Sequence, residues 1–553
     1  MEDLYVSTGN YVQNAQGQIV QFLYGNDCMD GCQLEKQSTN MGTCSQEEFE
    51  QQYMLSVEDL KQSVIKRFVP TKEDFQQREL SILTKLREEI RGEYYFVPFN
   101  VERIIASVKN EHSVPNKKTQ MSSDWVVDQL TNFFETVRIN KILGSLKDHL
   151  LTYSKYIIWS KLASKKVIVQ HKLNKKCFKM ILEQIKEKIE TGFVQSGEMV
   201  GPIAAQSIGE KLTQCVLDSF HSSGIASKTQ MSGGVQRFQE IIHVSKKPNN
   251  PALFISLKDE YKQNKQGIKK IQEQLQYSNL EFFLKSFSVY YDPDFTATED
   301  TELIAHHRKW FPEELGESPW VIVLEIDPAK LFQRKIDMEE LVACLDSFAD
   351  DKKMSIISSD HNAKTLKIHL RPLEHTIEDH DNLMSYQATL LDMTICGVQG
   401  IIESEIIKDS IGAISQGSQL REIMSMPWTD TYNTTSTNIH EILEIFGIEA
   451  TRQLIIQEVY KFLEQNGVYV NERHIDLLAD FITNQGILIA LDRHGIAKSH
   501  HSVLTAGSFE TVVPFLSKAG IFADRDDLNG VSPNIILGQI GKFGTGLSSI
   551  LMD

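Results

Sequence analysis

Apolar residues recur at helical spacing in two parts of the chain, and an alternating pattern dominates the part between them. Apolar positions three and four residues apart predict amphipathic helices, whereas alternation of apolar and polar positions predicts strands. The early helices are predicted at 47–91, with a break at Pro70, and at 125–145, 153–173 and 178–193. Strands are predicted at 19–24, 253–257, 320–326 and 365–370, and helices return after about Asp381, at 438–446, 448–465 and 472–484. The pattern therefore predicts an α+β protein.

Composition and charge restrict the kinds of protein that this chain can be. It has 553 residues, 41% hydrophobic and 24% charged, which is typical of a soluble protein with roughly three to four domains. Lys and Arg number 57 and Asp and Glu 74, so the net charge is 57 − 74 = −17. A free-standing nucleic-acid binder would carry a basic domain. Contact with DNA or RNA would then depend on local patches or on partner chains.

Cysteines and apolar stretches give little sign of a disulfide scaffold, a membrane span or a metal site. Seven scattered cysteines are too few for a disulfide framework, which indicates a reducing compartment. No apolar stretch approaches the roughly 18 residues of a membrane span, and no signal peptide follows Met1. Cys28, Cys32 and Cys44 lack a fourth zinc ligand, and 524–535 lacks the acidic last ligand of a calcium loop. The sequence predicts no metal site in this chain.

The segment 197–234 is richer in small residues than anything before it. Pro202 suits a first helical turn, and the helix is predicted to run to about His221, with Gly209 as a weak point. Gln214, Leu217, Asp218 and His221 stand at i, i+3, i+4 and i+7, so they share one face of that helix. A serine- and glycine-rich tip and a second helix at 235–244 complete a helical hairpin. By itself, a lone histidine on a helix is most simply a surface or core residue.

The hairpin resembles the trigger loop and its base in the largest subunit of multisubunit DNA-directed RNA polymerases. The matching residues are GEMVG at 197–201, AAQSIGE at 204–210, TQ at 213–214, FH at 220–221 and GV-x-R-x-x-EII at 234–242. Residues 14–37 resemble the stretch that follows the bridge helix, most closely in the RNA polymerase II type. Residues 442–450, 467–474, 493–495, 508–510 and 530–539 resemble the cleft, the first switch region and the end of the clamp. The resemblance is collinear along essentially the whole chain.

The resemblance implies an order of modules along the chain. We expect mostly helical cleft and foot modules, with a trigger-loop helical hairpin and an α/β jaw insertion. The implied segments are 1–45, a cleft segment after the bridge helix; 46–190, a foot-like helical module; 191–250, the trigger loop and flanking cleft; 251–385, a jaw-like α/β domain; 386–520, cleft helices and the switch region; and 521–553, the end of the clamp.

The resemblance also implies roles for the residues on the shared helix face. In that family the RNA 3′-hydroxyl attacks the α-phosphate of a ribonucleoside triphosphate with the help of two Mg²⁺ ions, and the trigger loop closes over the correctly paired nucleotide. His221 would reach the β-phosphate as a positive group or proton donor, Leu217 would pack under the nucleobase, and Gln214 would face the ribose.

Two positions depart from the family's pattern, and one motif is missing. Asp218 replaces an Asn and Lys211 a Pro, and a carboxylate beside a triphosphate is electrostatically unfavourable. The family's Asp-rich metal-binding loop does not occur in this sequence, so Mg²⁺ would be held by another chain or segment. The expected partners are the N-terminal part of the largest subunit, which bears those aspartates, the second-largest subunit, and DNA template, RNA transcript and nucleotides within the complex.

Three basic residues and the source of the chain leave alternatives open. Arg493, His494 and Lys498 are candidates for DNA contact, although a solvated loop is an equally good interpretation. The chain is expected to begin just past the bridge helix, which suggests a split gene or a large DNA virus. Its site would be the nucleus if cellular, and host cytoplasm or the virion if viral. The alternative function is a non-catalytic, polymerase-derived scaffold, for which Asp218 is the main argument.

Overall fold

A computed structural model of the chain divides into two compact units, each described by itself below. Unit 1 comprises Met1–Ser222, Ile242–Val244 and Ile455–Asp553, and unit 2 comprises Ser223–Ile241 and Ser245–Leu454. The structure describes residues 1–54, 72–90, 92, 94–111, 122–138, 141–221, 234–249, 251–262, 265–293, 309, 318–360, 363–373, 379–407, 410–415, 419–492, 495, 502–509 and 512–547. Both helices and strands are present, which agrees with the predicted α+β class.

Unit 1 begins with a small antiparallel sheet in the order β1-β2-β3. Its strands are β1 (Tyr5–Val6), β2 (Val12–Gln13) and β3 (Ile19–Gln21), followed by the short 3₁₀ helix η1 (Tyr24–Asn26). The strand predicted at 19–24 is thus present but shorter. It ends early because Gly25 adopts a positive φ of 58°, which turns the chain within η1.

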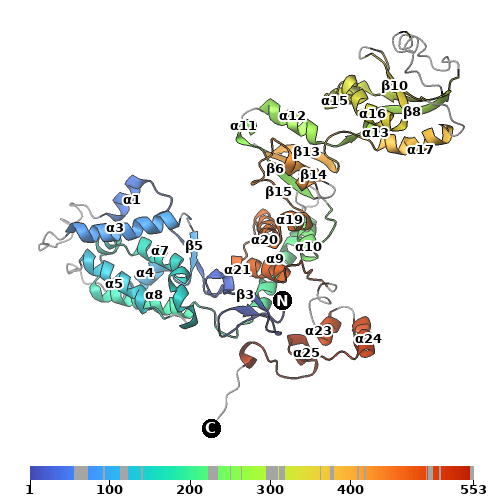
Figure 1. The fold of residues 1–553 in the computed structure, drawn as a ribbon. Coiled ribbons are helices and arrows are strands. Elements are labelled where there is room, and N and C mark those ends of the chain that lie inside the picture. Colours follow the sequence, from blue (N-terminus) through green and yellow to red (C-terminus); the bar gives the residue numbers. More distant parts are fainter. Residues whose placement is uncertain are drawn as a thin grey trace. The chain divides into compact units, whose positions relative to one another are not determined.

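A helical module follows within unit 1 (Figure 1). Its elements are β4 (Glu35–Ser38), α1 (Gln46–Tyr53), α3 (Lys72–Glu89), β5 (Tyr94–Val97), α4 (Val101–Glu111), α5 (Ser123–Thr136), η2 (Lys141–Leu146), α6 (Lys147–Leu150), α7 (Thr152–Lys161), η3 (Lys166–Gln170) and α8 (Lys175–Thr191). Apolar faces of these helices form one core that includes Leu130, Tyr156 and Phe178. Pro70, where a break between two helices was predicted, lies outside the described residues.

Two helices predicted in this module are shorter than expected, and long-range hydrogen bonds explain why. The predicted helix 125–145 ends at Thr136, where Val137 is extended and the Arg138 N–H donates to the Glu190 carboxylate at 2.8 Å. The predicted helix 153–173 ends at Lys161 and is followed by the π-helical turn η3. There the Ser164 N–H donates to the buried Glu79 carboxylate at 2.8 Å instead of continuing the helix. Burial raises the pKa of Glu79.

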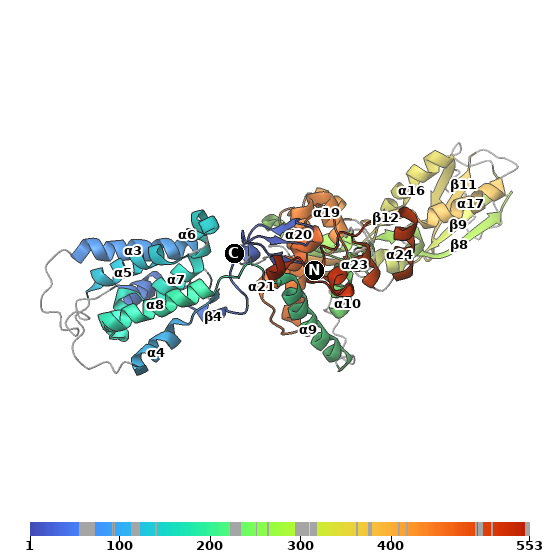
Figure 2. The ribbon, with the colours of Figure 1, turned by 90° about the horizontal axis from the view of Figure 1, so that it is seen from below.

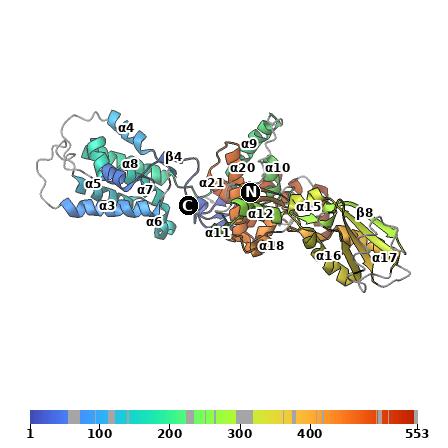
Figure 3. The same ribbon diagram turned by 90° about the horizontal axis from the view of Figure 1, so that it is seen from above.

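Unit 2 contains two four-stranded antiparallel sheets (Figure 3). One sheet has the order β10-β11-β9-β8, with β8 (Leu284–Tyr291), β9 (Trp320–Ile326), β10 (Met354–Ser358) and β11 (Leu366–Pro372). Buried residues of β9 and β11, among them Leu366, Ile368 and Leu370, form a core with residues of α16 (Met338–Lys352), and β11 overlaps the strand predicted at 365–370. The helices around this sheet are α13 (Leu280–Phe283), α15 (Pro328–Arg334) and α17 (Asp379–Leu391).

The second sheet of unit 2 contains strands that the sequence pattern did not predict. Its order is β13-β14-β6-β15, with β6 (Ala252–Ser256), β13 (Ile401–Ile407), β14 (Ser410–Ser415) and β15 (Thr435–Ser436). The short pair β7 (Ser278–Asn279) and β12 (Thr394–Cys396) lies outside it. Helices were expected after Asp381, but residues 394–415 are largely strands because β14 pairs with β6 across the boundary proposed at residue 385. Helices α11 (Asp259–Lys262), α12 (Lys265–Leu275) and α18 (Leu420–Ser425) accompany these strands.

The later helices agree closely with the pattern. The structure has α19 (Ile439–Phe446), α20 (Ile448–Gln465) and α21 (Glu472–Thr483), with Gly447 at a φ of 87° between the first two. The described end of unit 1 adds α23 (Val503–Ser508), α24 (Val512–Phe522), α25 (Val531–Ile536) and η4 (Gly544–Leu547). Within the described ranges, no helix combines the length and apolar character that crossing a membrane requires.

Candidate functional site

The candidate site is built on α9 (Val200–His221), a helix of 22 residues. It begins two residues before the predicted Pro202 and continues through Gly209 without a break. Val200, Ala204 and Ile208 are buried at i, i+4 and i+8, so the first half of the helix buries one continuous stripe. Figure 2 shows α9 beside α21, and both helices belong to unit 1.

The start of α9 is held by backbone bonds to β1. The Gly197 N–H donates to the Val6 carbonyl at 2.7 Å, the Val6 N–H to the Glu198 carbonyl at 2.9 Å, and the Gly201 N–H to the Leu4 carbonyl at 3.1 Å. A Cβ on Gly201 would lie only 1.9 Å from the Met1 carbonyl oxygen. Glycine is therefore required at this close approach between α9 and the start of the chain.

The first half of α9 also packs against an apolar cluster. Buried side chains of β1, β2, η1, α9 and α21 form it, and its members are Leu4, Val6, Val12, Tyr24, Val194, Val200, Ala204 and Leu477. Packing of this kind keeps a helix in one position, since the neighbouring side chains leave little free space. The first half of α9 is thus a fixed base for the part that follows.

A buried ion pair ties α21 to the same platform. The Arg473 Nε donates to Asp27 Oδ1 at 3.2 Å, Nη2 forms a second bond to Oδ2, and Nη1 donates to Asn471 Oδ1 at 3.1 Å. The two paired side chains are only 9% and 18% exposed. Burial raises the pKa of Asp27, and the Arg473 guanidinium opposes that rise. Gly25 lies against Arg473, where a Cβ would stand 2.4 Å from the Arg473 Cγ.

The second half of α9 carries the residues singled out from the sequence. Gln214 is exposed, and its neighbour Thr213 is exposed as well. Leu217, Asp218 and His221 lie within α9, so the i, i+3, i+4 and i+7 spacing falls on a single helix as predicted. The side chains of these three residues, and the tip at 222–233, are outside the described residues. Lys211 pairs with Glu210 at 3.5 Å in an exposed position.

The second predicted helix is α10 (Gly234–Ile242), which ends two residues before the predicted Val244. Phe238 and Ile241 are buried. Arg237 forms an ion pair with Glu240 at 3.1 Å and also donates to the Thr437 carbonyl, while Glu240 accepts from the Asn249 N–H at 3.0 Å. The sequence offered one signal for this network, the i, i+3 spacing of Arg237 and Glu240. The long-range partners at Thr437 and Asn249 gave none.

The remaining site predictions fall partly outside the described ranges. Arg493, His494 and Lys498 all lie outside the described residues. Just before them, Asp492 accepts from the Gly495 N–H at 2.7 Å and lies 3.7 Å from His243 Nδ1. Among the residues that the structure describes, no group of three or more His, Cys, Asp or Glu side chains is arranged to hold a metal ion.

The chain matches a known family over most of its length. The sequence model of the family described as RNA polymerase Rpb1, domain 5, matches residues 1–504. The matched region contains all of α9 and α10, the platform formed by β1, η1 and α21, and both sheets of unit 2.

Proposed function

Since the chain belongs to the family RNA polymerase Rpb1, domain 5, it is part of the largest subunit of a DNA-directed RNA polymerase, and we propose that α9 forms its nucleotide-closing trigger helix. One observation carries this proposal: the first half of α9 is packed on a fixed platform while Gln214, in the second half, is exposed to solvent. A closing lid needs an immobile base and a free working face.

The chemistry proposed for this face is the positioning of a ribonucleoside triphosphate. His221 would meet the β-phosphate, where an imidazolium would offset charge on the leaving pyrophosphate or donate a proton to it. Leu217 would pack under the base, and Gln214 would hydrogen-bond the ribose. In phosphoryl transfer most of the acceleration comes from positioning and charge neutralisation, so such a face can act without forming a covalent bond.

Asp218 distinguishes this site from the family's pattern. A carboxylate near a triphosphate is repelled by it, so Asp218 would not make the sugar contact that an Asn would make. We propose that Gln214, on the same helix face as Asp218, reads the ribose.

Mg²⁺ would be bound elsewhere in the assembly. The described residues of this chain do not fit a metal site, since they include no suitable group of ligands. We therefore assign the metal-binding aspartates to another chain or segment, which we propose is the N-terminal part of the largest subunit. The second-largest subunit, template DNA and the RNA transcript would complete the active centre, and the net charge of −17 agrees with a basic channel supplied largely by other chains.

The rest of the chain is proposed to frame the cleft. Within unit 2, the sheet of β8–β11 with α16 would serve as the jaw. Arg493, His494 and Lys498 would approach template DNA. The complex would act in the nucleus if it is cellular, and in host cytoplasm or the virion if it is viral.

Reconstitution tests the proposal. The chain should co-purify with a polypeptide that carries the metal-binding aspartates, and DNA-templated RNA synthesis should require both. A complex lacking the chain should lose synthesis, and adding the chain back should restore it. Full activity of a complex that assembles without this chain would contradict the proposal.

A non-catalytic scaffold is the alternative that Asp218 favours. Under that alternative the chain is needed for assembly, but changes on the exposed face of α9 leave the rate of nucleotide addition unchanged. Comparing assembly yield with rate separates the two functions. Gln214→Ala is suited to this comparison. Because Gln214 is exposed, its replacement removes no buried contact, and assembly of the complex should be unchanged.

A further inference from the structure

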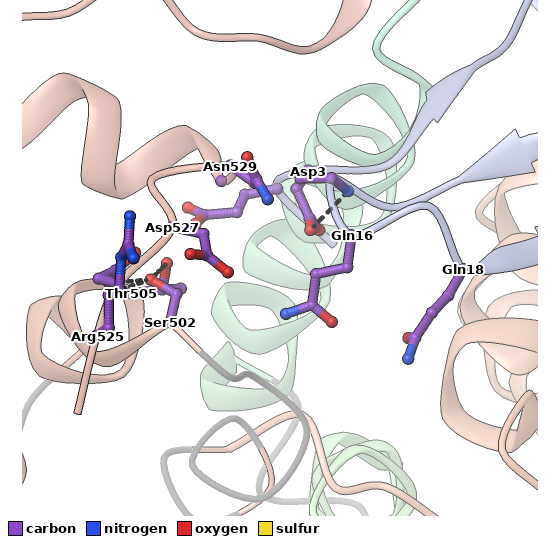
Figure 4. A pocket seen from close by; sticks show the side chains of 12 residues that line it. Asp3, Gln16, Gln18, Ser502, Thr505, Arg525, Asp527 and Asn529 are labelled. Carbon is purple, nitrogen blue, oxygen red and sulfur yellow. Dashed lines mark hydrogen bonds between the residues drawn. The ribbon is translucent and has the colours of Figure 1, made fainter.

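An open cavity of about 400 Å³ lies within unit 1, between the start of the chain and the segment after α24 (Figure 4). Its walls come from three places: the first residues of the chain, the turn between β2 and β3, and the region from α23 to Gly530. The residues that line it are Glu2, Asp3, Ala15, Gln16, Gln18, Ser502, Thr505, Arg525, Asp526, Asp527, Asn529 and Gly530. None of them belongs to the proposed nucleotide site.

The charge of the cavity is strongly negative. Its lining includes four carboxylates, those of Glu2, Asp3, Asp526 and Asp527, and one guanidinium, that of Arg525. Two of the carboxylates are engaged locally. Ser532 Oγ donates to both Glu2 oxygens at 2.9 Å, and Asp526 accepts from Ser502 and from the N–H groups of Leu504 and Leu528. Asp527 is exposed at the mouth.

Asp3 is the unusual member of the set. It is 4% exposed, and its Oδ2 accepts from the Ala15 N–H at 3.2 Å. Its Oδ1 is buried and has no hydrogen-bond partner within the described ranges. Figure 4 shows the carboxylate directed between Gln16 and Asp527. Burial lowers the pKa of the Met1 α-amino group, and the nearby charges of Asp3 and Glu2 oppose that shift. Burying a carboxylate oxygen without a hydrogen-bond donor costs folding free energy, and a bound cation with N–H groups would supply that donor.

The chemistry of the walls selects the kind of cation. Phosphates and nucleic acid are repelled by the four carboxylates. A metal ion is not favoured, because the described residues contain no group of three or more ligands with suitable geometry. A guanidinium offers five N–H donors in one plane, which suits a cavity lined by the carboxylates of Asp3 and Asp527 and by the side-chain amides of Gln16 and Asn529.

The neighbouring surface indicates that the guanidinium belongs to a polypeptide. Helix α24 ends just before the cavity and has no buried residue, and Val513, Ile521 and Phe522 are 74%, 78% and 67% exposed. An apolar surface of this kind beside a charged cavity is typical of a protein interface. We propose that this cavity receives an arginine side chain from a partner polypeptide, whose adjacent apolar residues cover α24.

Binding of a small probe to the purified full chain tests the proposal. The probe is N-acetyl-arginine methylamide, measured by saturation-transfer NMR at low salt, with the uncharged citrulline analogue as its isosteric control. The arginine probe should bind saturably and the citrulline probe should not. Asp3→Asn and Asp527→Asn should each weaken binding by about tenfold, the usual effect of losing one charge-assisted hydrogen bond. Asp524→Asn is the matched control, because Asp524 is exposed nearby but does not line the cavity.

The outcomes separate clearly. Equal binding of the two probes, or equal weakening by Asp524→Asn and Asp527→Asn, would overturn the proposal. Binding of Mn²⁺ that is lost in Asp3→Asn, without binding of the arginine probe, would assign the cavity to a metal instead. Because Asp527 is exposed, its variant keeps the test valid if Asp3→Asn fails to fold. RNA synthesis is not the readout, so failure here leaves the function proposed for α9 unaffected.

Discussion

Replacing Gly25 by alanine should loosen the platform beneath α9 through a residue far away in sequence. Gly25 has a φ of 58°, and a Cβ there would lie 2.4 Å from Arg473 Cγ and 2.8 Å from its Cδ. Real Cβ atoms do not approach neighbours so closely, so the Arg473 side chain must move. Its movement breaks the hydrogen bonds to Asp27, whose carboxylate would then be buried without its partner.

The magnitude follows from two separate costs. Alanine in the left-handed region costs about 1–2 kcal/mol. Removing one partner of a buried ion pair costs about 3–5 kcal/mol, because the other charge stays buried. Gly25→Ala should therefore destabilise this region by up to roughly the sum of the two. In an Arg473→Ala background, where Cγ is absent, the same change should cost only the backbone penalty of about 1–2 kcal/mol. The pair should thus be coupled by up to about 3–5 kcal/mol, the cost of the broken ion pair.

The assay must report local stability, because a chain of 553 residues in two units need not unfold in a single step. Hydrogen exchange measured by mass spectrometry gives the opening free energy of peptides from η1 and α21 in the four proteins of the cycle. Peptides from β9 and β11 in unit 2 serve as an internal control and should not change. Additive effects of Gly25→Ala and Arg473→Ala would refute the reasoning, since they would mean that the two side chains do not compete for space.

Three further predictions concern the working face, a buried histidine and the sheet of unit 2. Gln214→Ala should reduce discrimination against deoxyribonucleotides by about tenfold, the loss of one hydrogen bond, in competition assays where Thr213→Ala has little effect. Burial and the nearby Arg473 lower the pKa of His474 below its ordinary value of 6.5, so its stabilising contribution is complete above that pH and lost as the pH falls. The opening free energy of α21, obtained from exchange after correction for the pH dependence of intrinsic amide exchange, should therefore fall between pH 7 and 5, and fall less in His474→Gln. Arg371→Met should destabilise the β9–β11 region by about 3–5 kcal/mol in exchange measurements, because it leaves Asp292 buried at 1% exposure.

The helices were predicted well wherever local signals define them. Helix α20 matches its predicted bounds, and α19 and α21 differ by one residue at an end, because glycines at 447 and 467 end amphipathic patterns that the chain can form without distant help. The span of α9 was likewise predicted to within two residues at its start. Its helical spacing is a local property, so the placement of Gln214 and His221 on one helix followed from the sequence.

Features that depend on distant partners could not be predicted. Strand β14 is short and is stabilised by pairing with β6, more than 150 residues earlier, so its own pattern carried little signal. The break after α7 depends on Glu79, which lies 85 residues from Ser164. The platform under α9 depends on Arg473 and Asp27, which are 446 residues apart. Such contacts arise from packing that no short window of sequence contains.

The rate of single-nucleotide addition tests the central claim most directly. A reconstituted polymerase containing His221→Ala should add a matched nucleotide about tenfold or more slowly in rapid-quench measurements, the usual scale for a positioned proton donor or charge. His149→Ala is the matched control, because His149 is exposed on α6 and lies outside the proposed site, and it should leave the rate unchanged. An undiminished rate for His221→Ala in a fully assembled complex would contradict the assignment of α9 as the helix that closes on the nucleotide.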